Sequence, residues 1–186
     1  MKLLIYLRKV FLLRVQFLWN FISNNCYILL LAWLFVFLCA KGIRQWRDTA
    51  AVTRKMYRYF IGISFILYML VLFYVTVLCR EPFSGRHIML TFLWEYRLAL
   101  AGSLSWVFQI LNNIILFVPL GVLYGELDAK RNWWKALLRG AGLSVSIECL
   151  QYVCKAGLCE TDDVFNNTIG MILGYTFWLF CDKILR

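Results

Sequence analysis

The chain has 186 residues, of which 62% are hydrophobic and 16% are charged. An ordinary soluble domain is about 45–50% apolar and about 25% charged, so a soluble fold of this length could not bury so much apolar surface in one core. With only 2 prolines and 11 glycines, the composition also excludes a collagen-like or low-complexity chain. Lipid is therefore the expected solvent, and we expect an all-α, polytopic bundle of transmembrane helices.

The net charge of +10 would suggest nucleic-acid binding in a soluble protein. Here the basic residues lie mainly between apolar segments, as membrane topology requires, so we expect no nucleic-acid partner. The seven cysteines form no CxxC pair, which argues against a zinc site. We predict neither a metal nor a cofactor, and free thiols for most cysteines. Cys154 and Cys159, with Cys79 nearby, remain candidates for pairing at an oxidising face.

Apolar segments predict about five transmembrane helices of roughly 20 residues each. They cover approximately residues 25–40, 59–79, 103–124, 134–154 and 163–181. The preceding segment 3–21 is apolar but carries three cations, which favours an amphipathic helix in the interface over a sixth span. We divide the chain into an N-terminal part (1–58), a four-helix membrane domain (59–181) and a short cytoplasmic tail (182–186).

Loop charges predict the orientation, because Lys and Arg accumulate in cytoplasmic loops. The connections after the first and third predicted helices are the most basic, so we place them inside, and the loops at 80–102 and 155–162 outside. The C-terminus is then cytoplasmic and the N-terminus outside. The basic residues between Lys2 and Arg14 oppose this topology, and a sixth, N-terminal span would remove the conflict.

Polar residues within the predicted spans are informative, because a charged side chain in the bilayer costs several kcal/mol unless it faces protein or water. Glu148 and Gln151 share one face of the fourth helix with Ser144. Asp163 and Asn167 share one face at the start of the fifth helix. The predicted topology places both pairs at the same depth in the outer leaflet.

The third predicted helix runs inward, so its Asn113 lies in the same leaflet. We therefore predict an outward-facing polar cavity that is formed by Asn113, Glu148, Gln151, Asp163 and Asn167. A purely structural interpretation stays open: Glu148 would join an interhelical hydrogen-bond clasp worth about 0.6–2 kcal/mol per bond, and Thr161 or Asp162 would cap the fifth helix.

Other residues have simpler interpretations. In the third helix Pro119 is expected to produce a kink, and small residues at 121, 170 and 174 are expected to let helices approach closely. The loop residues Trp94 to Arg97 favour an interfacial helix on the outer surface. Arg80 suits lipid headgroups or an anion, and His87, the only histidine, has no second histidine with which to share a metal.

Three segments carry a resemblance to a known family: residues 113–121 (NIILFVPLG), 148–151 (ECLQ) and 163–170 (DVFNNTIG). In their order, spacing and placement on successive helices they resemble the VanZ-like family, named for a protein associated with teicoplanin resistance. The resemblance covers about residues 59–181. It departs from the family pattern at Glu160, where Asp is frequent, and at Gly157, where many members carry Arg. If that Arg binds an anion in relatives, the role is vacant here or falls to Lys155.

The resemblance implies a multi-pass protein of the bacterial cytoplasmic membrane that is linked to glycopeptide susceptibility, but it supplies no reaction. One hypothesis is a protein that modulates the response of the cell envelope to glycopeptides such as teicoplanin. Its expected partners are membrane lipid and a glycopeptide or lipid-linked envelope precursor at the outer polar cavity.

The alternative is a membrane-embedded enzyme acting on a lipid-linked envelope precursor, with Glu148 and Asp163 as an acid/base pair. A carboxylate–amide cage would also suit a divalent cation. No GxSxG, HExxH or phosphate-loop motif supports an enzyme, so catalysis is left open. A cation or proton path is a third possibility, weakened because no acidic residue lies in the inner half of a predicted span.

Overall fold

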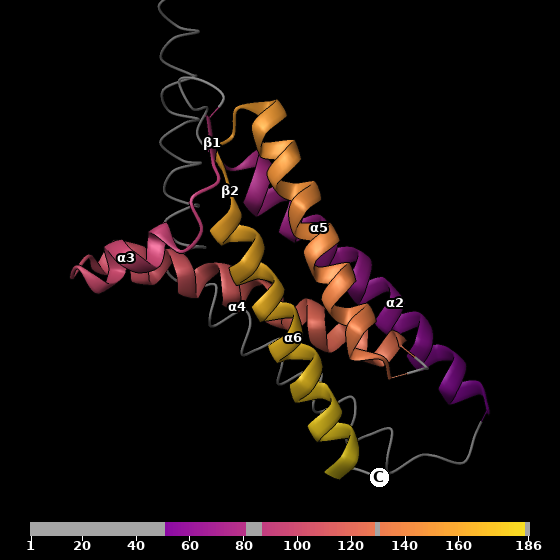
Figure 1. The fold of residues 1–186 in the computed structure, drawn as a ribbon. Coiled ribbons are helices and arrows are strands. Elements are labelled where there is room, and N and C mark those ends of the chain that lie inside the picture. The colour runs from indigo at the N-terminus through magenta and orange to yellow at the C-terminus, as the bar shows by residue number, and fades with distance from the viewer. Residues whose placement is uncertain (1–50, 81–86, 129–130, 185–186) are drawn as a thin grey trace, which may run out of the picture. The chain divides into compact units, whose positions relative to one another are not determined.

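The computed structural model describes residues 51–80, 87–128 and 131–184, which lie within one structural unit of residues 45–186. Apolar segments form its helices, and short loops carry two strands between them (Figure 1). The elements are α2 (Ala51–Phe73), the π-helical turn η1 (Tyr74–Leu78), β1 (His87–Met89), α3 (Trp94–Leu100), α4 (Leu104–Leu127), α5 (Trp133–Cys154), β2 (Leu158–Glu160) and α6 (Thr161–Ile184). The all-α prediction is confirmed, apart from the two three-residue strands.

Three helices in the described part of the chain are long and apolar enough to cross a membrane: Lys55–Leu78, Leu104–Leu127 and Thr161–Ile184. Each coincides with a predicted span to within a few residues. The fourth predicted span forms α5 in the expected place, but its charged and polar residues exclude it from this group. That α5 crosses the membrane therefore stays a prediction. The predicted segments at 3–21 and 25–40 lie outside the described residues.

Helix α6 packs against both α4 and α5, and α2 packs against α4. The approach of α4 to α6 depends on glycine. A Cβ atom at Gly170 or Gly174 would collide with the backbone carbonyl of Ile114 or Val118, respectively. These glycines confirm the predicted close approach of two backbones. Pro119 is buried inside α4, which continues as one helix through it.

The two strands join loops that are far apart in the sequence. Strand β1 pairs with β2 in parallel, with Ile88 opposite Cys159 and Met89 opposite Glu160. The pairing brings the strand that precedes α3 against the strand between α5 and α6 (Figure 1). The same end of the unit thus holds the start of α6, the end of α5 and the strand that leads into α3.

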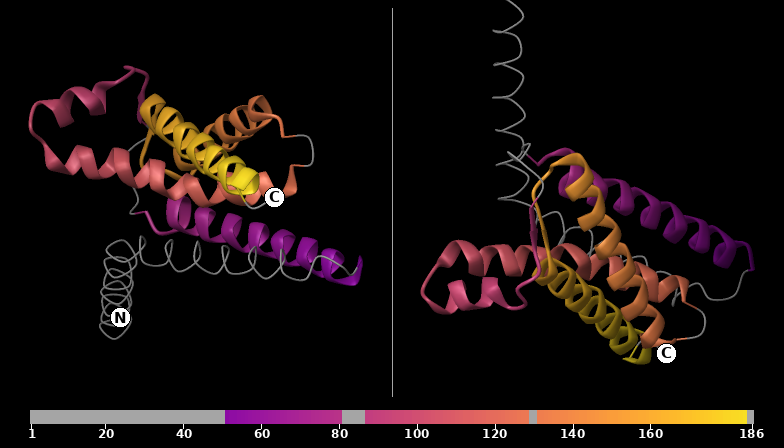
Figure 2. Two further views of the ribbon diagram at one scale, coloured as in Figure 1. Left: turned by 90° about the horizontal axis from the view of Figure 1, so that it is seen from below. Right: turned by 45° about the horizontal axis from the view of Figure 1, so that its top comes forward.

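Helix α3 runs back along the first part of α4, as the two views of Figure 2 show. The reversal is a tight turn over residues 101–103. Trp94 of α3 packs edge-to-face on Trp106 of α4, with ring centroids 4.6 Å apart. Leu93 enters α3 with a positive φ of 60°, which turns the chain sharply from the strand region into the helix.

Candidate functional site

All five predicted site residues lie in the described part of the chain. Asn113 is half-buried. The other four, Glu148, Gln151, Asp163 and Asn167, are each no more than 4% exposed. Polar side chains this deeply buried require partners, because an unpaired buried polar group costs roughly 1–3 kcal/mol. Their partners show which of the predicted contacts the fold makes.

Asp163 is the point where the predicted helices meet. The Nδ2 atom of Asn113 in α4 donates a hydrogen bond to Asp163 Oδ1 in α6 at 2.5 Å. On its other side, Asp163 Oδ2 lies 4.0 Å from the guanidinium of Arg80. The predicted convergence of Asn113 and Asp163 is therefore present, and the cation that accompanies it comes from the end of the second predicted span.

Glu148 lies on the opposite flank of the start of α6. Its Oε2 atom accepts a hydrogen bond from the backbone N–H of Glu160 at 2.9 Å. This bond fixes strand β2 against α5, directly before α6 begins. Glu148 thereby contacts the loop that leads to Asp163, as expected if the two residues share one level along the helices.

The two amides of the predicted site behave as structural clasps. Gln151 Nε2 donates to the carbonyl oxygen of Thr76 in η1 at 2.9 Å. Asn167 Nδ2 donates to Ser144 Oγ in α5 at 2.8 Å. Each bond joins a different pair of elements, so the five predicted residues do not share a single set of contacts. The predicted clasp involving the Ser144 face of α5 is present, with Asn167 as its partner.

A third buried carboxylate near Asp163 and Glu148 comes from outside the predicted spans. Glu95 of α3 has no solvent-exposed surface. Its Oε1 atom accepts from Gln109 Nε2 at 2.7 Å, and its Oε2 atom accepts from Asn166 Nδ2 at 3.1 Å. The expectation of a helix at Trp94 to Arg97 is confirmed, and its interfacial location stays a prediction; the side chain of Glu95 faces the protein interior. Its signal in the sequence was a single acidic residue between two aromatic residues in a largely apolar loop.

Asp162 fixes the start of α3 beside these buried carboxylates. Its Oδ1 atom accepts the backbone N–H of Leu93 at 2.6 Å, and its Oδ2 atom accepts the backbone N–H of Glu95 at 3.0 Å. The sequence offered Thr161 or Asp162 as the cap of α6. The bonds of Asp162 instead satisfy amides at the start of α3, and the hydroxyl of Thr161 has no hydrogen-bond partner among the described residues. Tyr96 adds a second tie, because its hydroxyl donates to Asn166 Oδ1 at 2.5 Å.

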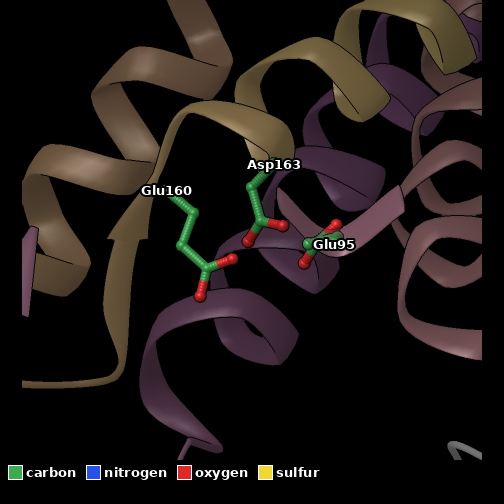
Figure 3. A group of neighbouring side chains, drawn as sticks. All are labelled: Glu95, Glu160 and Asp163. Atoms are coloured by element: carbon green, nitrogen blue, oxygen red, sulfur yellow. The ribbon is translucent and has the colours of Figure 1, made fainter. Parts of the chain in front are cut away.

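Glu95, Glu160 and Asp163 bring their carboxylates together (Figure 3). One oxygen from each group lies within 4.8 Å of an oxygen of the other two, and all three residues are buried. We call these three residues the carboxylate triad. It draws on α3, β2 and α6, so elements far apart in the sequence meet there.

Burial raises the pKa values of Glu95 and Glu160, the two triad members that lie outside the apolar helices. Burial raises the pKa of Glu95 to about 8, and the negative charges of Asp163 and Glu160 add to this increase. Burial raises the pKa of Glu160 to about 7; the charge of Asp163 adds to this increase, and hydrogen bonding with Glu95 and the charge of Arg80 oppose it. Near neutral pH, the triad is thus a place where negative charge needs a compensating proton or cation.

The model of the VanZ/LLP1 family matches residues 24–182 of the chain. The protein belongs to the VanZ/LLP1 family. This VanZ/LLP1 match begins before residue 59 and takes in the predicted first helix at 25–40. Together with the three long apolar helices, the family identifies a VanZ-like membrane protein. No curated protein and no protein of solved structure gives a significant match.

One departure from the VanZ-like pattern has a structural counterpart. A Cβ atom at Gly157 would lie 2.9 Å from Nη1 of Arg80, so the guanidinium of Arg80 fills the space beside the glycine. Lys155, the other cation considered for this role, is exposed. In this VanZ/LLP1 protein the positive charge next to Gly157 therefore belongs to Arg80, which also faces Asp163.

Proposed function

We propose that this VanZ-like protein modulates the susceptibility of the bacterial cell envelope to glycopeptides such as teicoplanin. In this proposal the buried acids at the start of α6 and the neighbouring Arg80, which we call the polar cluster, face the outer side of the cytoplasmic membrane. The polar cluster engages a glycopeptide or a lipid-linked envelope precursor there. The resemblance of the sequence to the VanZ-like family supports the link to glycopeptides, and the loop charges of the sequence support the orientation.

The observation that carries the proposal is the number of buried acids at one end of the unit. Five acids, Glu95, Glu148, Glu160, Asp162 and Asp163, are each at most 4% exposed, and Arg80 is the cation that lies beside them in the described part of the chain. Replacing buried ionic groups with apolar residues is often neutral or stabilising. A bundle that needed only stability would therefore gain little from five such groups, which favours a role in recognition.

Arg80 is the group through which the cluster would meet a ligand. Its side chain is 31% exposed, whereas the Asp163 side chain behind it is 3% exposed. A guanidinium that is partly open to the surroundings offers several donors in a planar fork, the geometry that phosphate and carboxylate groups accept. A precursor with a phosphate, or a glycopeptide with a carboxylate, carries such a group.

A membrane-embedded enzyme acting on a lipid-linked precursor is the second candidate. It is favoured by the same pairing of a partly exposed cation with carboxylates behind it, since Glu148 and Asp163 would then act as the acid/base pair next to a bound anionic group. Binding and catalysis differ in one respect: only the enzyme changes the chemical composition of the precursor pool.

The test measures teicoplanin susceptibility in a bacterial host that expresses the wild type, Glu148→Gln or Asp163→Asn at matched membrane levels. Both substitutions keep size and remove charge. Glu126→Gln is the matched control, because Glu126 lies in α4 away from the cluster and its Oε1 accepts from Trp178 Nε1 at 2.8 Å, a bond that Gln retains.

We expect the wild type and Glu126→Gln to raise the inhibitory concentration of teicoplanin, and the two cluster variants to lose the effect. Protection by all four proteins would reduce the cluster to a structural clasp and refute its proposed role. Absence of protection by the wild type would refute the glycopeptide function itself. Mass spectrometry of the lipid-linked precursors in the same cells separates the enzyme from the binding protein.

A further inference from the structure

The carboxylate triad has the geometry of a cation site. We propose that Glu95, Glu160 and Asp163 together bind one divalent metal cation of the kind that prefers oxygen ligands. The inference goes beyond the proposed function, because it assigns a ligand to the cluster that no glycopeptide phenotype requires. It also differs from the sequence-based expectation that no metal binds. Of the three proposed ligands, only Asp163 belonged to the site predicted from the sequence.

The separations of the oxygens fit one central ion. Ca²⁺ binds oxygen at about 2.3–2.6 Å, so two of its ligands can lie up to about 4.6–5.2 Å apart. The three carboxylate oxygens of the triad lie within 4.8 Å of one another. A calcium-sized ion would thus reach all three groups with at most a small movement of the side chains. Figure 3 shows the side chains of Glu160 and Asp163 directing their carboxylates toward each other, with Glu95 beside them.

An unsatisfied oxygen points independently to a missing ligand. Glu160 is 4% exposed, and among the described residues its buried Oε2 atom has no hydrogen bond of regular geometry, although the carboxyl group of Glu95 and the indole N–H of Trp94 lie near its carboxylate. Arg80 does not supply one, because its contact is with Asp163, at 4.0 Å. Leaving a buried acceptor without a partner costs roughly 1–3 kcal/mol, and more for a charged group. A cation between the carboxylates removes this cost.

Amide side chains hold the other two ligands in position. Gln109 and Asn166 each donate to one oxygen of Glu95, and Asn113 donates to Asp163. Ligating carboxylates in metal sites are commonly hydrogen-bonded in this way, and the bonds fix the orientation of the ligand. Donors of this kind also stabilise the ionised carboxylate, which is the form that binds metal.

The charge of the neighbourhood favours a cation with two charges. Glu148, bonded to the N–H of Glu160, and Asp162, bonded to the N–H of Glu95, add two further acids, and Arg80 brings one positive charge. Protons are the competing occupants, because a proton shared between two carboxyl groups would also reduce the repulsion. The two occupants differ in a measurable way: only a metal gives a saturable response to Ca²⁺ or Mn²⁺.

The test uses the purified full chain in detergent after removal of metals with EDTA. Isothermal titration with CaCl₂ measures affinity and stoichiometry, and Mn²⁺ paramagnetic resonance reports the oxygen ligands directly. The variant is Glu160→Gln, which keeps volume and removes one ligand charge. Glu126→Gln is the control, since Glu126 lies near the opposite end of α4. Circular dichroism in EDTA verifies that each variant is folded before titration.

We expect one Ca²⁺ per chain for the wild type and for the control, and an affinity at least about tenfold weaker for Glu160→Gln. Absence of binding by the folded wild type at millimolar Ca²⁺ would overturn the proposal in favour of shared protons. Equal binding by Glu160→Gln would overturn the triad as the site. Because no glycopeptide enters this experiment, its failure leaves the susceptibility test untouched, and the converse also holds.

Discussion

Asp162 offers the sharpest test of how the candidate site is assembled. Its two carboxylate oxygens accept the backbone N–H groups of Leu93 and Glu95, at 2.6 and 3.0 Å. In Asp162→Asn one oxygen becomes an amide nitrogen, so one of the two N–H groups loses its acceptor and faces a donor. A hydrogen bond to a charged group contributes about 1.5–3 kcal/mol. We therefore expect the opening equilibrium of the start of α3 to increase about tenfold to a hundredfold.

Hydrogen–deuterium exchange of the detergent-solubilised protein measures this opening at the amides of Leu93 and Glu95. Exchange at these two amides should accelerate about tenfold to a hundredfold. The amides of α6 around Gly170 and of the facing part of α4 should keep their protection. Asp182→Asn is the control: Asp182 pairs with Arg131 near the end of α6, and an exposed pair of this kind contributes about 0–1 kcal/mol. Unchanged exchange at both α3 amides in Asp162→Asn would refute the argument that Asp162 anchors α3.

Three further results are expected. Gly174→Ala should lower the free energy of unfolding by about 1–3 kcal/mol, because the added methyl group overlaps a carbonyl of α4. Gly142→Ala in α5 should raise the free energy of unfolding by about 0.5–1 kcal/mol, because no atom lies near the added methyl group. Equal shifts of the melting temperature in the two variants would contradict this. Without metal, stability should fall as the pH rises from about 4.5 to about 8, since the folded forms of Glu95 and Glu160 bind protons more tightly than the ordinary carboxyl with a pKa of 4.5. Melting curves across that range, repeated for Glu95→Gln, should show a smaller fall in the variant, and a rise with pH would refute the assignment. All five described cysteines are free thiols, so thiol counts on this part of the chain should be equal before and after reduction.

Much of the helical fold could be predicted from the sequence because lipid imposes a simple rule on it. An apolar segment of about 20 residues is both the signal and the structure, so the spans at 59–79, 103–124 and 163–181 have their counterparts in α2 with η1, α4 and α6. Small residues spaced by four positions also predicted a close contact, which α4 and α6 make through Gly170 and Gly174.

One predicted contact of the site is present where depth alone decides it. Asn113 and Asp163 lie at the same level on helices that pack together, and they are hydrogen-bonded. Depth does not tell which neighbour a residue faces, however. Gln151 is one turn from Glu148 on the same helix face, yet it bonds to Thr76, whereas Glu148 bonds to Glu160. Such choices depend on helix rotation and crossing, which a single sequence does not contain.

Glu95 was missed because loop structure brings it to the site. A parallel pair of three-residue strands and a left-handed residue, Leu93, direct α3 back toward α6. Strands this short show no alternation of apolar and polar residues, so they leave no pattern in the sequence. The acidic residue then looked like part of an amphipathic interfacial helix, although its side chain is bonded to Gln109 and Asn166.

The excess of acids at the start of α6 has a physical explanation in their different directions. Successive residues of a helix point about 100° apart, so neighbouring acids face different partners. Asp162 turns to the amides of α3, and Asp163 turns to Asn113 and Arg80. Glu160, in the strand before them, presents its N–H to Glu148 and its carboxylate to the triad. Capping one helix would require only one of these acids. The other two are explained by the triad, because each brings a carboxylate to a point that Glu95 reaches from a separate element.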